Sequence, residues 1–112
     1  MPPRDWRFRI EDMLEAIEKI QRACRGLELE SFRENELIVD AVLRNLAVIG
    51  EAARHVPDEV VAATPGIPWA NIRGMRNVVV HEYFGVDLDS IWETTQDDLP
   101  PLLPQLRRLL ET

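Results

Sequence analysis

The chain has 112 residues, a length that suits one core, so we expect a single domain over residues 1–112. Hydrophobic residues make up 46% of the sequence and charged residues 29%, a balance that excludes a mostly disordered chain. The net charge of −7 argues against long-range capture of nucleic acid, although it leaves room for a local basic site.

The cysteine content and the apolar runs exclude several further classes. Cys24 is the single cysteine and lies among apolar positions, so we expect a small core residue and no intrachain disulfide. The charged N-terminal stretch lacks the apolar run of a secretory signal, and no run approaches the roughly 18 apolar residues of a membrane span. We therefore expect a cytoplasmic protein that contacts no membrane and needs no metal or other cofactor.

Two long amphipathic helices are predicted in the first half of the chain. Apolar residues recur at spacings of three and four from about residue 5 to residue 25, and Gly26 is a plausible stop. Ser31 and Glu34 fit a capping box, with Ser31 as the cap, for a second helix that continues to about Val56. We expect these two helices to be antiparallel neighbours.

Shorter helices are predicted next. Pro57 ends the second helix or starts a short helical turn over residues 58–63. Pro68 suits the first turn of a helix that begins at Trp69 and ends near residues 83–85.

The last predicted helical region begins at a cap formed by Asp87 or Asp89. Three late prolines predict a kink or a break before a final helix over residues 103–110. They are Pro100, Pro101 and Pro104. Because no segment shows a convincing strand period, we expect an all-α, up-down bundle of four to five helices.

One stretch of the chain gathers groups that can carry chemistry. On a helix, Arg73, Asn77 and His81 are each four residues apart and would form one polar stripe, and Arg76 and Tyr83 would lie together on a neighbouring stripe. Arginine can clamp a phosphate, histidine can carry a proton near neutral pH, and Asn77 could orient the imidazole. From the residues alone, packing or capping is the commoner role for such a histidine and tyrosine.

A second polar stripe lies on the predicted second helix. Arg44, Glu51 and His55 share one face of it, at spacings of seven and four. They either line the same cleft, fix Arg73 or Arg76 through salt bridges, or form a solvated or interhelical ion-pair stripe, which is the commoner case. The tryptophans could stack bases, although anchoring in the core or a dimer interface is commoner. They are Trp6, Trp69 and Trp92.

The spacing of three polar residues resembles a known family. Arg76, His81 and Tyr83 match the R-x4-H-x-Y pattern of HepT-like proteins of the HEPN class, with no departure within the motif. The flanking segments 44–52 and 65–77 are similar to the helix and loop that precede the motif in that family. The resemblance extends from about residue 4 to residue 110.

The resemblance implies a helical homodimer in which two motif helices form a shared basic cleft. It implies a metal-independent ribonuclease toxin that acts on RNA, with Arg76 and His81 as catalytic residues and Arg73 and Asn77 as substrate-positioning residues. The family's partner is a minimal nucleotidyltransferase antitoxin, in some systems one that transfers AMP to the motif tyrosine, here Tyr83. Further assembly of the dimer with antitoxin into a larger complex is left open.

Two considerations bear on this expectation. On an ideal helix, Arg76 and His81 would point about 140° apart, which independently favours a site completed by a second protomer. The alternative is a non-catalytic HEPN module that binds nucleotides or assembles with a nucleotidyltransferase. The acidic net charge favours that module, and the intact motif favours the ribonuclease.

Overall fold

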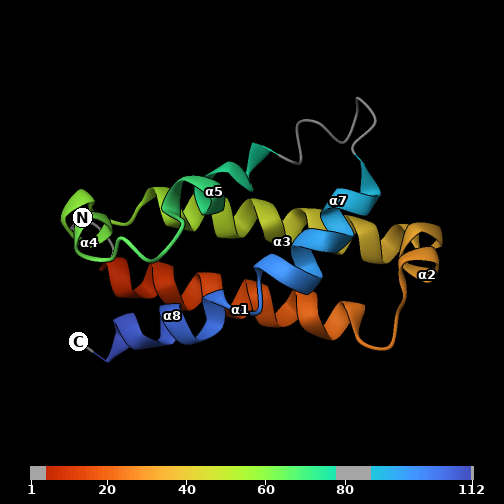
Figure 1. The fold of residues 1–112 in the computed structure, drawn as a ribbon, viewed down its shortest axis with the longest axis horizontal. Coiled ribbons are helices and arrows are strands. Elements are labelled where there is room, and N and C mark those ends of the chain that lie inside the picture. Colours follow the sequence, from red (N-terminus) through yellow and green to blue (C-terminus); the bar gives the residue numbers. More distant parts are fainter. Residues whose placement is uncertain (1–4, 78–86, 112) are drawn as a thin grey trace.

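Two 19-residue helices form the centre of the molecule. The computed structural model describes residues 5–77 and 87–111. Within it, α1 (Trp6–Cys24) and α3 (Glu36–Arg54) run antiparallel along the long axis (Figure 1). They make the most extensive helix-to-helix contact among the described elements, which confirms the prediction that the two long helices are neighbours.

Helix α1 follows its predicted pattern closely. The Asp5 side chain accepts a hydrogen bond from the backbone N–H of Arg7 at 2.9 Å and so caps the first turn. Gly26 has a φ of 78°, a left-handed conformation that favours glycine, and the helix stops before it as expected. Burial raises the pKa of the Cys24 thiol, which a hydrogen bond with Thr95 partly offsets, so this thiol belongs to the core as predicted.

The predicted start of the second helix is wrong. The chain forms a short helix, α2 (Leu29–Glu34), and then bends at Asn35 before α3 begins. Ser31 lies inside α2, where its hydroxyl accepts a hydrogen bond from the backbone N–H of Glu28 at 2.8 Å, so Glu28 occupies the cap position. The Asn35 side chain caps α3 by accepting from the N–H of Ile38 at 3.1 Å.

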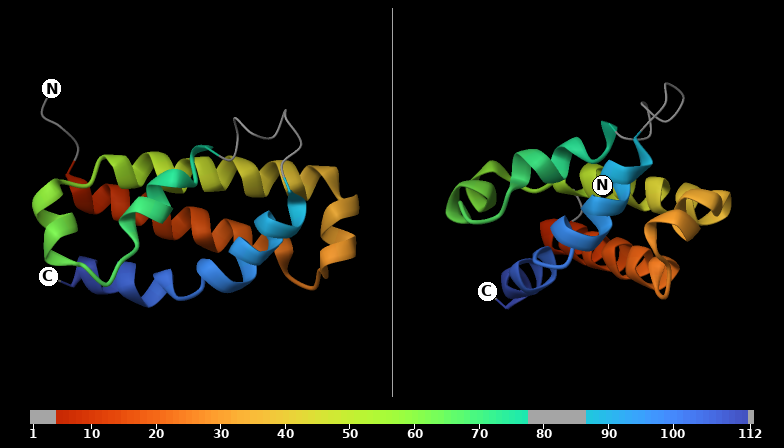
Figure 2. Two further views of the ribbon diagram at one scale, coloured as in Figure 1. Left: turned by 45° about the horizontal axis from the view of Figure 1, so that its top comes forward. Right: turned by 45° about the vertical axis from the view of Figure 1, so that its right-hand side comes forward.

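The bend at Asn35 lets α2 close one end of the bundle (Figures 1 and 2). Its Phe32 is fully buried and packs on Trp92, with the two ring centroids 5.1 Å apart. This contact joins α2 to α7 (Leu88–Glu93), which crosses the bundle near that end. Trp92 therefore anchors the fold, the commoner of its two predicted roles.

The middle of the chain confirms two predictions and corrects a third. Helix α4 (Asp58–Ala63) follows Pro57, and α5 (Trp69–Gly74) begins at the predicted residue. The expected continuous helix to residues 83–85 is wrong, because α5 ends at Gly74 and is followed by a turn before helical geometry resumes at Asn77. Residues 78–86 lie outside the described part of the chain.

The C-terminal third also confirms most of its pattern. Asp87 caps α7 by accepting from the N–H of Asp89 at 3.0 Å, and the Ser90 hydroxyl and this amide hold its pKa below the ordinary range. A π-helical segment, η2 (Thr94–Asp98), follows α7. Pro100 and Pro101 then interrupt the helix before α8 (Leu102–Leu110) begins. Helix α8 packs along α1.

The fold class is all-α, as predicted. The described residues contain no strand, and they form seven α-helices instead of four or five because bends and prolines divide the expected elements. Most of the core lies between α1, α3 and α8, with α5 laid over α3 (Figure 2). None of the described helices is both long and apolar enough to span a bilayer.

Two leucines of α3 give a direct test of where the core lies. Leu43 is 2% exposed and Leu37 is 82% exposed. Leu43→Ala is expected to lower the free energy of unfolding by about 2–5 kcal/mol, through lost burial and a residual cavity. Leu37→Ala on the same helix is expected to change it by no more than about 0.5 kcal/mol. Urea unfolding of both variants measures the difference, and equal losses would contradict this assignment of the core.

Candidate active site

The backbone of Arg76 lies directly against α3, at Gly50. A Cβ at Gly50 would fall on the backbone nitrogen of Arg76, 2.9 Å from its Cβ and 3.0 Å from the carbonyl oxygen of Arg73. These neighbours are mostly backbone atoms, which cannot rotate away. A glycine inside a helix costs about 1 kcal/mol relative to alanine, and here it permits a close approach that no other residue allows.

The side chain of Arg76 is held by a carboxylate on α3. Its Nε lies 3.1 Å from Oε2 of Glu51, and Nε2 of His55 lies 3.5 Å from Oε1 of the same carboxylate. Glu51 therefore sits between the arginine and the histidine, and all three side chains are about half-exposed. Of the alternatives left open by the sequence, a salt bridge to Arg76 is the one found for Glu51.

Arg44, the third residue of that predicted stripe, is placed elsewhere. It lines a surface depression between α1 and α3, together with Glu15 and Lys19. The stripe is therefore divided: Glu51 pairs with Arg76 and His55 contacts Glu51, whereas Arg44 faces the depression beside α1.

The guanidinium of Arg73 turns toward the protein. Its Nε donates to the carbonyl oxygen of Ala53 at 3.3 Å, and its Nη2 donates to that of Val56 at 3.4 Å. Ala53 lies in the last turn of α3 and Val56 lies two residues beyond its end, a region where helix carbonyls commonly accept from groups outside the helix. Arg73 thus ties the end of α3 to α5, and its contact with a substrate stays a prediction.

The structure describes some of the remaining predicted site residues and not others. Asn77 is exposed one residue beyond Arg76. His81 and Tyr83 lie outside the described residues, so their predicted roles stay predictions. Trp69 is buried, and its indole N–H donates to the Thr64 hydroxyl at 2.9 Å, so it anchors the fold. Trp6 lies under the guanidinium of Arg7, 4.6 Å from the ring centroid.

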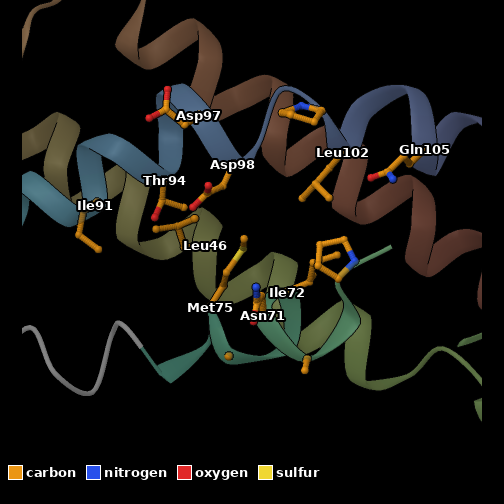
Figure 3. A pocket seen from close by; sticks show the side chains of 14 residues that line it. Leu46, Asn71, Ile72, Met75, Ile91, Thr94, Asp97, Asp98, Leu102 and Gln105 are labelled. Carbon is orange, nitrogen blue, oxygen red and sulfur yellow. The ribbon is translucent and has the colours of Figure 1, made fainter. Parts of the chain in front are cut away.

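A cavity of about 650 Å³ opens on another side of α5 (Figure 3). Its wall on η2 carries Asp97 and Asp98, whereas Asn71 faces it from α5 and Leu46 and Ile72 are among its apolar residues. None of the Arg76, Glu51 and His55 side chains lines it. Two carboxylates repel phosphate, so this cavity is a poor place for an RNA backbone.

Acidic residues are concentrated in two segments of the chain. Residues 28–40 and 87–98 hold ten acidic residues and a single basic one, Arg33, whereas the rest of the chain holds twelve basic and ten acidic residues. The two segments meet where α2 contacts α7 and where Arg33 pairs with Asp89 at 3.0 Å. The acidic start of α3 is about 22 Å from Glu51 along the helix, more than two Debye lengths at physiological salt.

The geometry can now be compared with known proteins. The family model described as ribonuclease HepT-like matches residues 13–109. The chain belongs to the HepT-like ribonuclease family. No solved structure gives a significant match to it.

Individual relatives of this HepT-like chain agree with the family match. A Methanocaldococcus jannaschii protein named "Putative RNase" is 35% identical over 111 residues, which span 99% of this chain and 92% of that protein. A Thermococcus cleftensis protein named "Probable ribonuclease HepT" is 37% identical over 100 residues, 89% of this chain and 91% of that protein. A Caldanaerobacter subterraneus protein, also named "Putative RNase", is 34% identical over 102 residues, 91% of each chain.

The HepT-like match includes every residue of the candidate site, from Gly50 to Tyr83. It confirms the resemblance that the R-x4-H-x-Y spacing suggested. Sequence reasoning missed the role of Gly50, although a glycine inside an otherwise regular helical pattern is a signal of close packing.

Gly50→Ala tests the close approach. The added methyl group would collide with the Arg76 backbone, so we expect the free energy of unfolding to fall by about 1–3 kcal/mol. Gly74→Ala is the matched control, because a Cβ there meets nothing within 4 Å. It should leave stability unchanged or raise it by about 0.4–1 kcal/mol. Thermal and urea unfolding distinguish the two, and an equally mild effect of Gly50→Ala would show that α3 and the Arg76 turn are not in contact.

Proposed function

We propose that this protein is a ribonuclease toxin of a toxin–antitoxin system, with Arg76 and His81 as its catalytic residues. The observation that carries the proposal is the placement of Arg76. Its backbone is fixed against Gly50, one edge of its guanidinium is held by Glu51, and its side chain remains half-exposed to solvent. A guanidinium that is both held in place and accessible to solvent is suited to bind a phosphate of a substrate. The chain also belongs to the family of HepT-like ribonucleases.

The proposed chemistry uses a nucleophile supplied by the RNA itself. A ribose 2′-hydroxyl attacks the adjacent phosphorus and the 5′-oxygen of the next nucleotide leaves. His81 acts as the general base or the general acid for these proton transfers. Arg76 stabilises the negative charge that builds up on the phosphate oxygens, while Asn77 and Arg73 position the backbone. Because the nucleophile is part of the substrate, the reaction needs no metal-bound water.

A homodimer would complete this site. Cleavage needs one group to take a proton and another to give one, and a second motif segment from a partner protomer would supply the missing histidine and a second arginine. The acidic residues of segment 28–40 lie toward the end of α3 that is remote from Glu51, which is compatible with RNA binding near Arg76.

Control by a minimal nucleotidyltransferase antitoxin would act on Tyr83. AMP on this tyrosine adds a bulky anion seven residues from Arg76 and two from His81. Such a group would compete with the RNA phosphate and block access to the site.

The catalytic assignment predicts how substitutions act. Arg76→Ala and His81→Ala should each lower RNA cleavage by about 10²–10⁴-fold and abolish growth arrest on expression. Arg108→Ala, an exposed arginine on α8, is the control and should cleave like the wild type. The measurement is the cleavage rate of purified protein on single-stranded RNA. An Arg76→Ala variant that cleaves normally would contradict the assignment, and a wild type that binds nucleotide without cleaving RNA would favour the non-catalytic module.

The regulatory assignment predicts a change in mass. Protein purified after co-expression with a minimal nucleotidyltransferase antitoxin should gain mass in steps of AMP. Tyr83→Phe should gain none and should stay toxic in the presence of that partner. Intact-mass spectrometry is applied to the wild type and to Tyr83→Phe, each purified with and without the partner. If the partner protects cells equally well from the wild type and from Tyr83→Phe, control through Tyr83 is ruled out.

A further inference from the structure

We infer that Glu51 is a positioning residue of the ribonuclease site, which aims the guanidinium of Arg76 at the RNA phosphate, and that His55 restrains Glu51. The inference rests on the proposed function and deepens it. It concerns two residues outside the R-x4-H-x-Y motif, Glu51 of α3 and His55, which directly follows the last residue of that helix.

Glu51 holds one edge of the Arg76 guanidinium. A guanidinium is a planar fork with five N–H donors, and Glu51 binds it at Nε, at 3.1 Å. No other ion-pair or hydrogen-bond partner of this side chain lies among the described residues. A carboxylate at Nε fixes the plane of the fork and leaves donors on the Nη atoms for a phosphate.

The ion pair between Glu51 and Arg76 contributes little to the stability of the fold. Both side chains are about half-exposed, and an exposed pair contributes between about 0 and 1 kcal/mol. A carboxylate this close to the predicted phosphate position also opposes the binding of RNA in the ground state. Its benefit is therefore expected in the orientation of Arg76 during the reaction, because misplacement by about 1 Å can cost about 10²-fold in rate.

Helix α3 and the residue that follows it supply all of these contacts. Gly50 admits the Arg76 backbone, Glu51 follows it directly in the sequence and reaches the Arg76 side chain, and His55 lies one helical turn later. The His55 ring contacts the second oxygen of the Glu51 carboxylate, at 3.5 Å, and so restrains its rotation. Backbone and side chain of Arg76 are thus fixed by adjacent residues of one rigid helix.

The test is steady-state kinetics of RNA cleavage by the full chain, with kcat and KM measured separately. Glu51→Ala should lower kcat about tenfold and leave KM unchanged or lower, because orientation is lost while a repelling charge is removed. Glu51→Gln keeps an acceptor oxygen and should retain most of kcat, and His55→Ala should lower kcat by a smaller factor. Glu59→Gln, an exposed residue of α4, is the control and should match the wild type.

A double-mutant cycle shows whether Glu51 acts through Arg76. Arg76→Lys keeps the charge but removes the Nε edge, so Glu51→Ala should cost little further activity in that background. Independent, multiplicative losses would overturn the inference. So would a Glu51→Ala variant of normal kcat, or one whose loss in kcat disappears after correction for the unfolded fraction measured by thermal melting.

The failures of the two proposals are distinguishable. A wild type that cleaves RNA while Glu51→Ala cleaves equally well overturns the role of Glu51 alone. A wild type that cleaves no RNA overturns the proposed function, and the role of Glu51 with it.

Discussion

The candidate site depends on one close contact, the approach of the Arg76 backbone to α3 at a position without a side chain. Because Gly50 has no Cβ, the turn after α5 can rest directly on the helix. That approach brings the Arg76 side chain within reach of Glu51 and sets α5 where Arg73 can donate to the carbonyls of Ala53 and Val56, at and just beyond the end of α3. A residue with a Cβ at this position would push the turn away from α3. Both contacts, that of Arg76 with Glu51 and that of Arg73 with the carbonyls, would then be lost at once.

Acidic residues are unevenly distributed along the bundle. Segment 28–40 lies at the α2 end and α3 carries Glu51 toward the opposite end, whereas Asp97 and Asp98 of segment 87–98 line the cavity beside α5. A phosphate near Arg76 is therefore screened by salt from most of the acidic residues on α2. Glu51 is the acidic residue shown beside Arg76, and its carboxylate is already bound to that arginine and to His55.

Much of the fold could be read from the sequence because its signals are local. The stripe of α1, the stop at Gly26, the entry at Trp69 and the cap at Asp87 depend on residues a few positions apart. The start of the second helix was misread because Ser31-x-x-Glu34 satisfies a capping rule that Glu28 and Ser31 satisfy in its place. The end of α5 was misread because its apolar spacing continues past Gly74, where the chain turns to meet α3.

The site itself could be predicted only as a set of residue types. The R-x4-H-x-Y spacing indicated Arg76, His81 and Tyr83. It does not reveal which side chains of other helices contact these residues. Glu51 was one of several polar residues on α3, and the sequence could not choose between a cleft, a salt bridge and a solvated stripe. The choice depends on the close contact of Gly50 with Arg76, which brings Arg76 beside Glu51. This tertiary contact joins residues 26 positions apart, so local sequence patterns do not reveal it.

The most direct measurement is the chemistry of the RNA ends produced by the purified protein. The account predicts a 2′,3′-cyclic phosphate on one fragment and a 5′-hydroxyl on the other, because the 2′-hydroxyl is the nucleophile. It also predicts that one 2′-deoxy substitution at the cleaved position blocks the cut. Cleavage of the 2′-deoxy position at the normal rate, or fragments that carry a 5′-phosphate, would contradict the account.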